Sequence, residues 1–158
     1  MSGYFLDTSA LAKLYHREDG SQYVERLVGI RGSSTIISRL SLVEMESVLA
    51  IKVRTGELDA EGQELARRRL RANVAQGRIR LGPTIEERHY RNARNLLARY
   101  GVERGLRTLD AIQLAVALGL RELGLVSVFV AADQRLCRAA EDCDFSTVDP
   151  ANTGALIV

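Results

Sequence analysis

The sequence predicts an α/β fold: a three-layer α/β/α sandwich with a mostly parallel central sheet. Short runs of aromatic and β-branched residues alternate with longer helical segments from end to end of the chain, which is the pattern of βαβ units. The chain of 158 residues has the length of one domain with a substantial core. No repeat, low-complexity segment or linker divides it, so residues 1–158 are expected to form a single domain.

Composition narrows the class of protein further. Hydrophobic residues make up 46% and charged residues 27%, which is typical of a folded globular protein. The net charge of +2 does not by itself indicate a nucleic-acid partner. Cys137 and Cys143 lack metal-type spacing and are interpreted as reduced thiols. With no signal peptide and no apolar run of about 20 residues, we expect a cytoplasmic protein.

The N-terminal part of the chain is expected to hold two strands. Tyr4–Leu6 is a short aromatic and branched-apolar run, typical of a strand, and helices over residues 10–15 and 21–28 follow it. The β-branched run Thr35–Ile37 predicts the second strand. The segment Ser38–Arg54 then predicts a helix, with apolar residues at so many positions that we expect it to be largely buried.

The middle of the chain predicts two helices separated by a short strand. Asp59 is expected to cap a helix that ends before Gly77. Ile79 and Leu81 alternate with arginines, which indicates a short, half-exposed strand. The segment Thr84–Glu87 has the pattern of a capping box and opens the next helix.

The C-terminal part contains the clearest strand. Thr108 is expected to cap a strongly apolar helix over residues 109–123. The segment Val126–Val130 is unbroken and apolar, as a buried parallel strand should be. It leads into Asp133 at the start of another helix, and Phe145–Val148 predicts the last strand.

Four acidic residues stand at or near the starts of helices with apolar neighbours. Asp7 and Asp133 each follow an apolar strand, so in a parallel sheet both would lie at the same edge. Glu44 lies early in the predicted helix 38–54, where Glu46 competes with it, and Asp110 follows the expected cap of the next apolar helix. Each acid taken singly has a structural explanation, because an acid in the first turn stabilises a helix by roughly 0.3–1 kcal/mol.

Taken together, the four acids point to a metal site. Carboxylates that converge on one pocket repel each other and raise their pKa values unless a cation holds them. Hard oxygen ligands suit Mg²⁺ or Mn²⁺. Such a site can bind phosphate oxygens and activate a water. The residues therefore indicate metal-dependent phosphotransfer or phosphodiester hydrolysis.

Four motifs follow one another along the chain: Leu6-Asp7-Thr8-Ser9-Ala10-Leu11, Ser41-Leu42-Val43-Glu44, Arg107-Thr108-Leu109-Asp110-Ala111-Ile112-Gln113-Leu114-Ala115 and Phe129-Val130-Ala131-Ala132-Asp133-Gln134-Arg135-Leu136. In this order they resemble the motifs of PIN domains, and the whole chain is similar to the VapC toxins of bacterial and archaeal toxin–antitoxin pairs. The resemblance covers essentially the entire sequence.

The resemblance implies a Mg²⁺- or Mn²⁺-dependent endoribonuclease that cuts single-stranded or loop regions of RNA. Asp7, Glu44, Asp110 and Asp133 would form the metal site, with Asp7 and Asp110 foremost as direct ligands. Ser9 would hydrogen-bond within that site. The resemblance also implies a homodimer and a small antitoxin protein that wraps the toxin and blocks the acidic pocket.

Some alternatives stay open at this point. A catalytically inactive PIN-like module that binds RNA or a protein is the second function considered. The arginines of the segment Arg67–Arg71 could grip RNA phosphates, although a solvated helix face is the preferred interpretation. Asp142 and Asp144 are expected at the surface, and His89 is expected to pack in the core rather than act in catalysis.

Overall fold

The computed structural model describes residues 2–153 and contains one five-stranded sheet. Its strands lie in the order β3-β2-β1-β4-β5, and every pair of neighbours is parallel. The strands are β1 (Gly3–Leu6), β2 (Ser34–Ile37), β3 (Arg80–Leu81), β4 (Val128–Val130) and β5 (Ser146–Val148). The helices are α1 (Thr8–Leu11) with the 3-10 turn η1 (Ala12–Leu14), α2 (Ser21–Val28), α3 (Leu40–Arg54), α4 (Ala60–Ala75), α5 (Glu87–Tyr100), α6 (Thr108–Glu122) and α7 (Gln134–Asp142).

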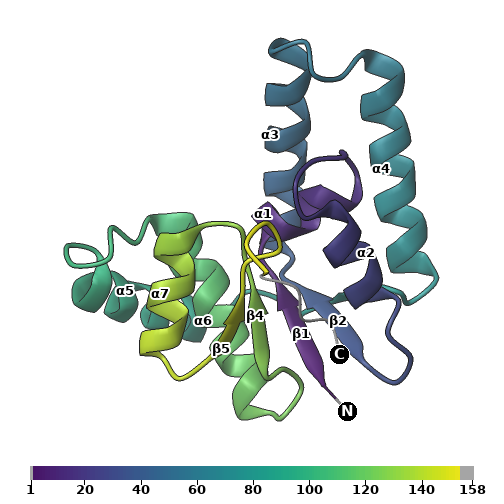
Figure 1. The fold of residues 1–158 in the computed structure, drawn as a ribbon. Helices are drawn as coiled ribbons and strands as arrows, with labels where there is room; N and C mark the ends of the chain where they lie inside the picture. Colours follow the sequence, from purple (N-terminus) through teal and green to yellow (C-terminus); the bar gives the residue numbers. More distant parts are fainter. Residues whose placement is uncertain (1, 154–158) are drawn as a thin grey trace.

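Helices cover both faces of the sheet, which confirms the predicted α/β/α sandwich. Figure 1 shows α5, α6 and α7 on one side of the strands and α1 to α4 on the other. Alternate residues of the central strands face the two layers: Phe5 stacks on Phe129 towards α6, whereas Leu6 and Val130 pack towards α1. Two hydrophobic cores result, one on each face. The sheet is parallel throughout the described residues, and not only mostly so.

The strand order reverses direction between β1 and β4. From β1 the chain moves outward to β2 and β3, and it then crosses back to build β4 and β5 on the other side. Parallel strands that leave from a common line in opposite directions open a crevice at their carboxyl ends, and ligands of open α/β sheets bind there. A ligand-binding site is therefore expected at the carboxyl ends of β1 and β4.

Helix α3 differs from the prediction that it would be largely buried. Met45 and Leu49 are buried, but Leu42, Val43 and Ile51 are exposed, with 69% exposure for Val43. The reason is tertiary: α3 pairs with α4 and the two stand away from the layer of α5 to α7 (Figure 1), so only one side of α3 is covered. Between the two helices lies an apolar groove of about 370 Å³.

Several helix caps also differ from the predicted ones. Asp59 caps α4 through the amide of Gly62, as predicted. Helix α1 is capped by Asp7, because the helix begins directly where β1 ends. Two predicted caps were wrong: Glu86, and not Thr84, precedes α5, and Arg107, and not Thr108, precedes α6.

Both cysteines are free thiols in the structure, as expected. Within residues 2–153, no helix combines the length and the apolar character that crossing a membrane requires.

Candidate metal centre

Asp7 lies at the point where the strand order reverses. It follows the last residue of β1, and its amide donates a hydrogen bond to Val130 O at the end of β4. Its side chain is buried, with 5% exposure. One carboxylate oxygen accepts hydrogen bonds from the amide of Ser9 at 3.1 Å and from the Ser9 hydroxyl at 2.7 Å.

The surroundings of Asp7 disfavour its negative charge. Burial raises the pKa of its carboxyl to about 6, although the two hydrogen bonds from Ser9 act in the opposite direction. The negative charges of Glu44 and Asp110 raise this pKa further. Glu44 and Asp110 thus lie close enough to Asp7 to influence its ionisation. A cation bound nearby would stabilise the ionised form of Asp7.

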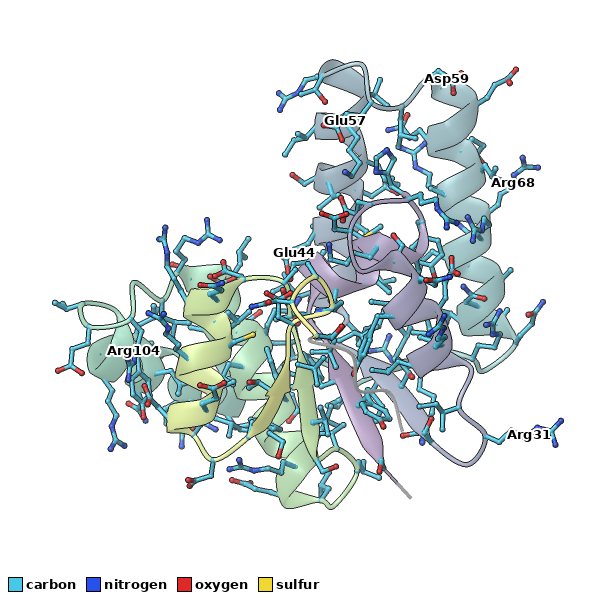
Figure 2. The ribbon with its side chains drawn as sticks, in the orientation of Figure 1. Arg31, Glu44, Glu57, Asp59, Arg68 and Arg104 are labelled. Carbon is cyan, nitrogen blue, oxygen red and sulfur yellow. The ribbon has the colours of Figure 1, made fainter. Side chains whose placement is uncertain are left out.

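Glu44 is held near Asp7 by a polar network that is largely buried. One carboxylate oxygen, Oε1, accepts hydrogen bonds from Thr8 Oγ1 at 3.0 Å and from Gln113 Nε2 at 2.6 Å. Gln113 also donates to Thr8 and to Ser41, at 3.1 and 2.9 Å. Figure 2 shows Glu44 near the lower end of α3, close to the carboxyl ends of the strands, whereas Glu57 lies beside the upper part of that helix.

Glu46, the competing acid, faces elsewhere. It forms a bidentate ion pair with Arg67 of α4, with nitrogen–oxygen distances of 2.8 to 3.0 Å. Arg67 lowers the pKa of the Glu46 carboxyl through these hydrogen bonds. Glu46 therefore belongs to the groove between α3 and α4, and Glu44 to the edge that holds Asp7.

Asp110 and Asp133 are joined by an arginine. Arg107 donates from Nε to Asp110 and from Nη2 to Asp133, both at 3.3 Å. Asp133 uses its other oxygen to cap α7, through the amides of Arg135 and Leu136. Burial raises the pKa of the Asp110 carboxyl, and the positive charge of Arg107 partly offsets this effect.

The donor set fits Mg²⁺ or Mn²⁺ by its chemistry, since all four acids offer carboxylate oxygens. Within residues 2–153, however, no three His, Cys, Asp or Glu side chains are arranged so that they could hold a metal ion together. Arg107 supplies the positive charge for two of the acids, and Glu44 is directed towards Gln113. The Arg107 side chain is 70% exposed, so it has room to move away when a metal ion binds.

Sequence reasoning assigned no role to Gln113 or Arg107, although both lie in the motif around Asp110. The available signal for Gln113 was an amide within the stretch 111–118, where every other residue is Ala, Ile, Leu or Val. For Arg107 the signal was its place three residues before an acid, where a helix brings the two side chains together.

A shallow depression of about 540 Å³ borders the acidic edge, the part of the sheet edge that carries Asp7, Glu44, Asp110 and Asp133. Ser9 and Asp133 line it together with two arginines of α7, Arg135 and Arg138. It is open to solvent and carries both signs of charge. An anionic chain that entered here would meet the arginines beside the carboxylates.

The other residues considered lie away from this edge. The arginines of the segment Arg67–Arg71 do not form one patch: Arg67 pairs with Glu46, while Arg69 lies over the ring of Tyr15. His89 is buried and accepts a hydrogen bond from the amide of Glu86, as expected of a packed histidine.

The two acids near the C-terminus are exposed, as expected. Asp142, at the end of α7, is paired with Arg104. Asp144 lies in the turn that follows α7.

Several solved structures share this fold. FitAcB from Neisseria gonorrhoeae has a TM-score of 0.63 at 16% identity, covering 95% of this chain and 99% of that one. VapBC2 from Rickettsia felis, bound to a DNA fragment from their promoter, has a TM-score of 0.61 at 14% identity, covering 92% and 97%. VapC20 of Mycobacterium tuberculosis, a Sarcin-Ricin loop cleaving toxin, has a TM-score of 0.60 at 20% identity, covering 86% and 94%. At these identities the likeness shows the fold alone.

The sequence itself carries the family relationship. No curated protein matches the chain. The family model of the PIN domain, in contrast, matches residues 4–142, which include all four acids of the candidate metal centre. The chain therefore belongs to the PIN domain family.

Proposed function

We propose that the protein is a divalent-metal-dependent endoribonuclease and acts as the toxin of a VapBC-type toxin–antitoxin pair. The observation that carries this proposal is the gathering of Asp7, Glu44, Asp110 and Asp133 at the edge where the strand order reverses. They come from four separate parts of the chain. A fold has no structural need to collect mutually repelling charges in this way.

In this proposal the four acids hold Mg²⁺ or Mn²⁺, with Asp7 and Asp110 as the central ligands. The metal would supply Lewis-acid chemistry and a lowered pKa of a bound water. Ser9 fixes the orientation of the Asp7 carboxylate through its hydroxyl. The raised pKa of Asp7 supports the assignment, since a buried carboxylate stays ionised at neutral pH at a cost that a cation offsets.

We propose RNA as the substrate. Arg107, Arg135 and Arg138 lie at or beside the acidic edge, where they would bind the backbone phosphates on either side of the cleaved bond. Cleavage should therefore weaken as the salt concentration rises. A cleaving toxin, VapC20, is among the proteins that share this fold.

The test is RNA cleavage by the purified protein with Mn²⁺, with Mg²⁺ and in EDTA, beside the Asp7→Asn variant. We expect cleavage with either metal, none in EDTA, and none from a folded Asp7→Asn protein. An active Asp7→Asn protein, or equal activity in EDTA, would refute the metal-dependent mechanism. RNA binding without cleavage would instead favour the inactive PIN-like module.

A small antitoxin protein is the partner that we propose, and homodimer formation stays a prediction. The groove between α3 and α4 supports the antitoxin, because apolar side chains of both helices line it and charged ones border it. The apolar ones are Leu42, Met45, Leu49, Leu70, Val74 and Ala75, and the charged ones are Glu46, Arg67 and Arg71. An amphipathic segment of the partner would bury this surface.

The antitoxin test uses growth arrest. Expression of the wild-type protein should arrest growth, and co-expression of a small protein encoded beside its gene should relieve the arrest. Leu42→Asp places a charge in the exposed part of the groove, so this variant should still arrest growth but escape relief. If the partner neutralises both proteins equally, the groove is not where it binds.

A further inference from the structure

Gln113 is fully buried in α6, yet its side chain reaches three oxygen atoms on the opposite side of the site. Its amide nitrogen donates to Glu44 Oε1 at 2.6 Å, to Ser41 Oγ at 2.9 Å and to Thr8 Oγ1 at 3.1 Å. These partners are 69, 72 and 105 residues away in the sequence. One side chain thus links α6 to both α1 and α3.

The orientation of this amide follows from Glu44. Turned the other way, the amide would direct its oxygen at a carboxylate oxygen, and two acceptors repel each other. With the nitrogen towards Glu44, the amide oxygen of Gln113 is buried and finds no hydrogen-bond partner among residues 2–153. A buried acceptor without a partner costs free energy, and an apolar side chain of the same size would avoid that cost. This cost offsets part of the stabilisation that the hydrogen bonds of the amide nitrogen provide.

We propose that Gln113 is a positioning residue for Glu44, an inference that rests on the proposed metal-dependent function. The two hydrogen bonds that the carboxylate accepts within residues 2–153, from Gln113 and Thr8, go to Oε1, so Oε2 would be the oxygen left to hold a metal ion. The network holds Glu44, a half-buried member of the candidate metal centre, near Asp7. Replacing a residue that hydrogen-bonds to a metal ligand commonly lowers metal affinity or activity by 10-fold to 100-fold.

The experiment measures Mn²⁺ binding by calorimetry, which does not depend on RNA cleavage. We expect Gln113→Leu to weaken Mn²⁺ binding about 10-fold. Its melting temperature in EDTA should stay within about 4 °C of wild type, because the lost hydrogen bonds and the removed unpartnered oxygen offset each other. Gln22→Leu, on the exposed surface of α2, is the matched control and should bind Mn²⁺ like wild type. If Gln113→Leu does not fold, Gln113→Met keeps an unbranched side chain of similar length.

A double-mutant cycle distinguishes positioning from a general structural role. If Gln113 acts through Glu44, then Gln113→Leu should weaken Mn²⁺ binding in the wild-type background and not in the Glu44→Gln background. An equal loss in both backgrounds would overturn the inference. So would unchanged Mn²⁺ binding by a folded Gln113→Leu or Gln113→Met protein, or a wild-type protein that binds no Mn²⁺. If the cycle behaves as expected but RNA stays uncut, the proposed nuclease fails and the positioning role stands.

Discussion

The hydroxyl of Ser9 donates a 2.7 Å hydrogen bond to the carboxylate of Asp7, two residues earlier in the chain. The same hydroxyl accepts a hydrogen bond from the amide of Ala132, at 2.9 Å. Ser9 thereby ties the start of α1 to the turn after β4. It also stabilises the ionised form of Asp7, because a hydrogen bond donated to a carboxylate lowers its pKa.

The first prediction concerns this hydrogen bond. Replacing Ser9 with Ala removes a donor to Asp7, so the pKa of Asp7 should rise further above its ordinary value. Stability at neutral pH should fall by about 1 kcal/mol, since the amide of Ala132 also loses its acceptor. A pH titration of the Asp7 carboxyl carbon by NMR in EDTA measures the shift. An unchanged pKa would mean that Ser9 does not contact the carboxylate in solution.

The second prediction concerns stability and pH in the metal-free protein. Folding raises the pKa of Asp7 from 3.8 to about 6, so the folded state binds its proton more tightly than the unfolded state does. The contribution of Asp7 to stability is therefore greatest below pH 3.8 and is lost as the pH rises to about 6. A rise in pKa from 3.8 to about 6 corresponds to a loss of roughly 3 kcal/mol of stability.

Asp7→Asn removes this effect, because an amide does not ionise. In EDTA at pH 7.5, the variant should be more stable than wild type by up to about 3 kcal/mol, and the difference should shrink below pH 5. Urea unfolding across this pH range measures both quantities. A variant less stable than wild type at pH 7.5 would contradict the raised pKa of Asp7.

The third prediction concerns competition between Arg107 and a divalent cation. Arg107 is paired with Asp110 and Asp133, so a metal ion that uses these carboxylates must displace it. Arg107→Gln should therefore bind Mn²⁺ about twofold to fivefold more tightly, in keeping with the energy of an exposed ion pair. Arg94→Gln, which breaks an exposed pair with Glu87 on α5, carries the same change of charge and should leave the affinity unchanged. Weaker binding by Arg107→Gln would show that Arg107 assists the metal site.

The fourth prediction separates Glu44 from Glu46. Glu44→Gln should abolish RNA cleavage, because it removes a carboxylate that influences Asp7. Glu46→Gln should leave cleavage close to wild type, since Glu46 pairs with Arg67 in the groove between α3 and α4. Its effect on stability should be below about 1 kcal/mol, as for other exposed ion pairs. The reverse result would exchange the roles of the two acids.

Much of the fold was predictable from local patterns. The predicted strands Tyr4–Leu6 and Val126–Val130 agree with β1 and β4 to within two residues at each end. They were recognisable because a buried parallel strand is apolar on both faces. The cap of α4 by Asp59 was also predictable. The burial of α3 was not, because apolar residues around a helix do not reveal which of them a neighbouring helix leaves exposed.

The candidate site divides in the same way. The sequence by itself determined which four acids are candidates and that each lies at or near the start of a helix. Residue types and the periods of strands and helices are local properties, so both could be inferred without the structure. Only the tertiary structure decided that Glu44 rather than Glu46 lies near Asp7, and that Arg107 bridges Asp110 and Asp133. It also brought Gln113 to Glu44 across 69 residues. The physical reason is that such contacts depend on how strands and helices pack, and no local pattern records which distant side chains meet.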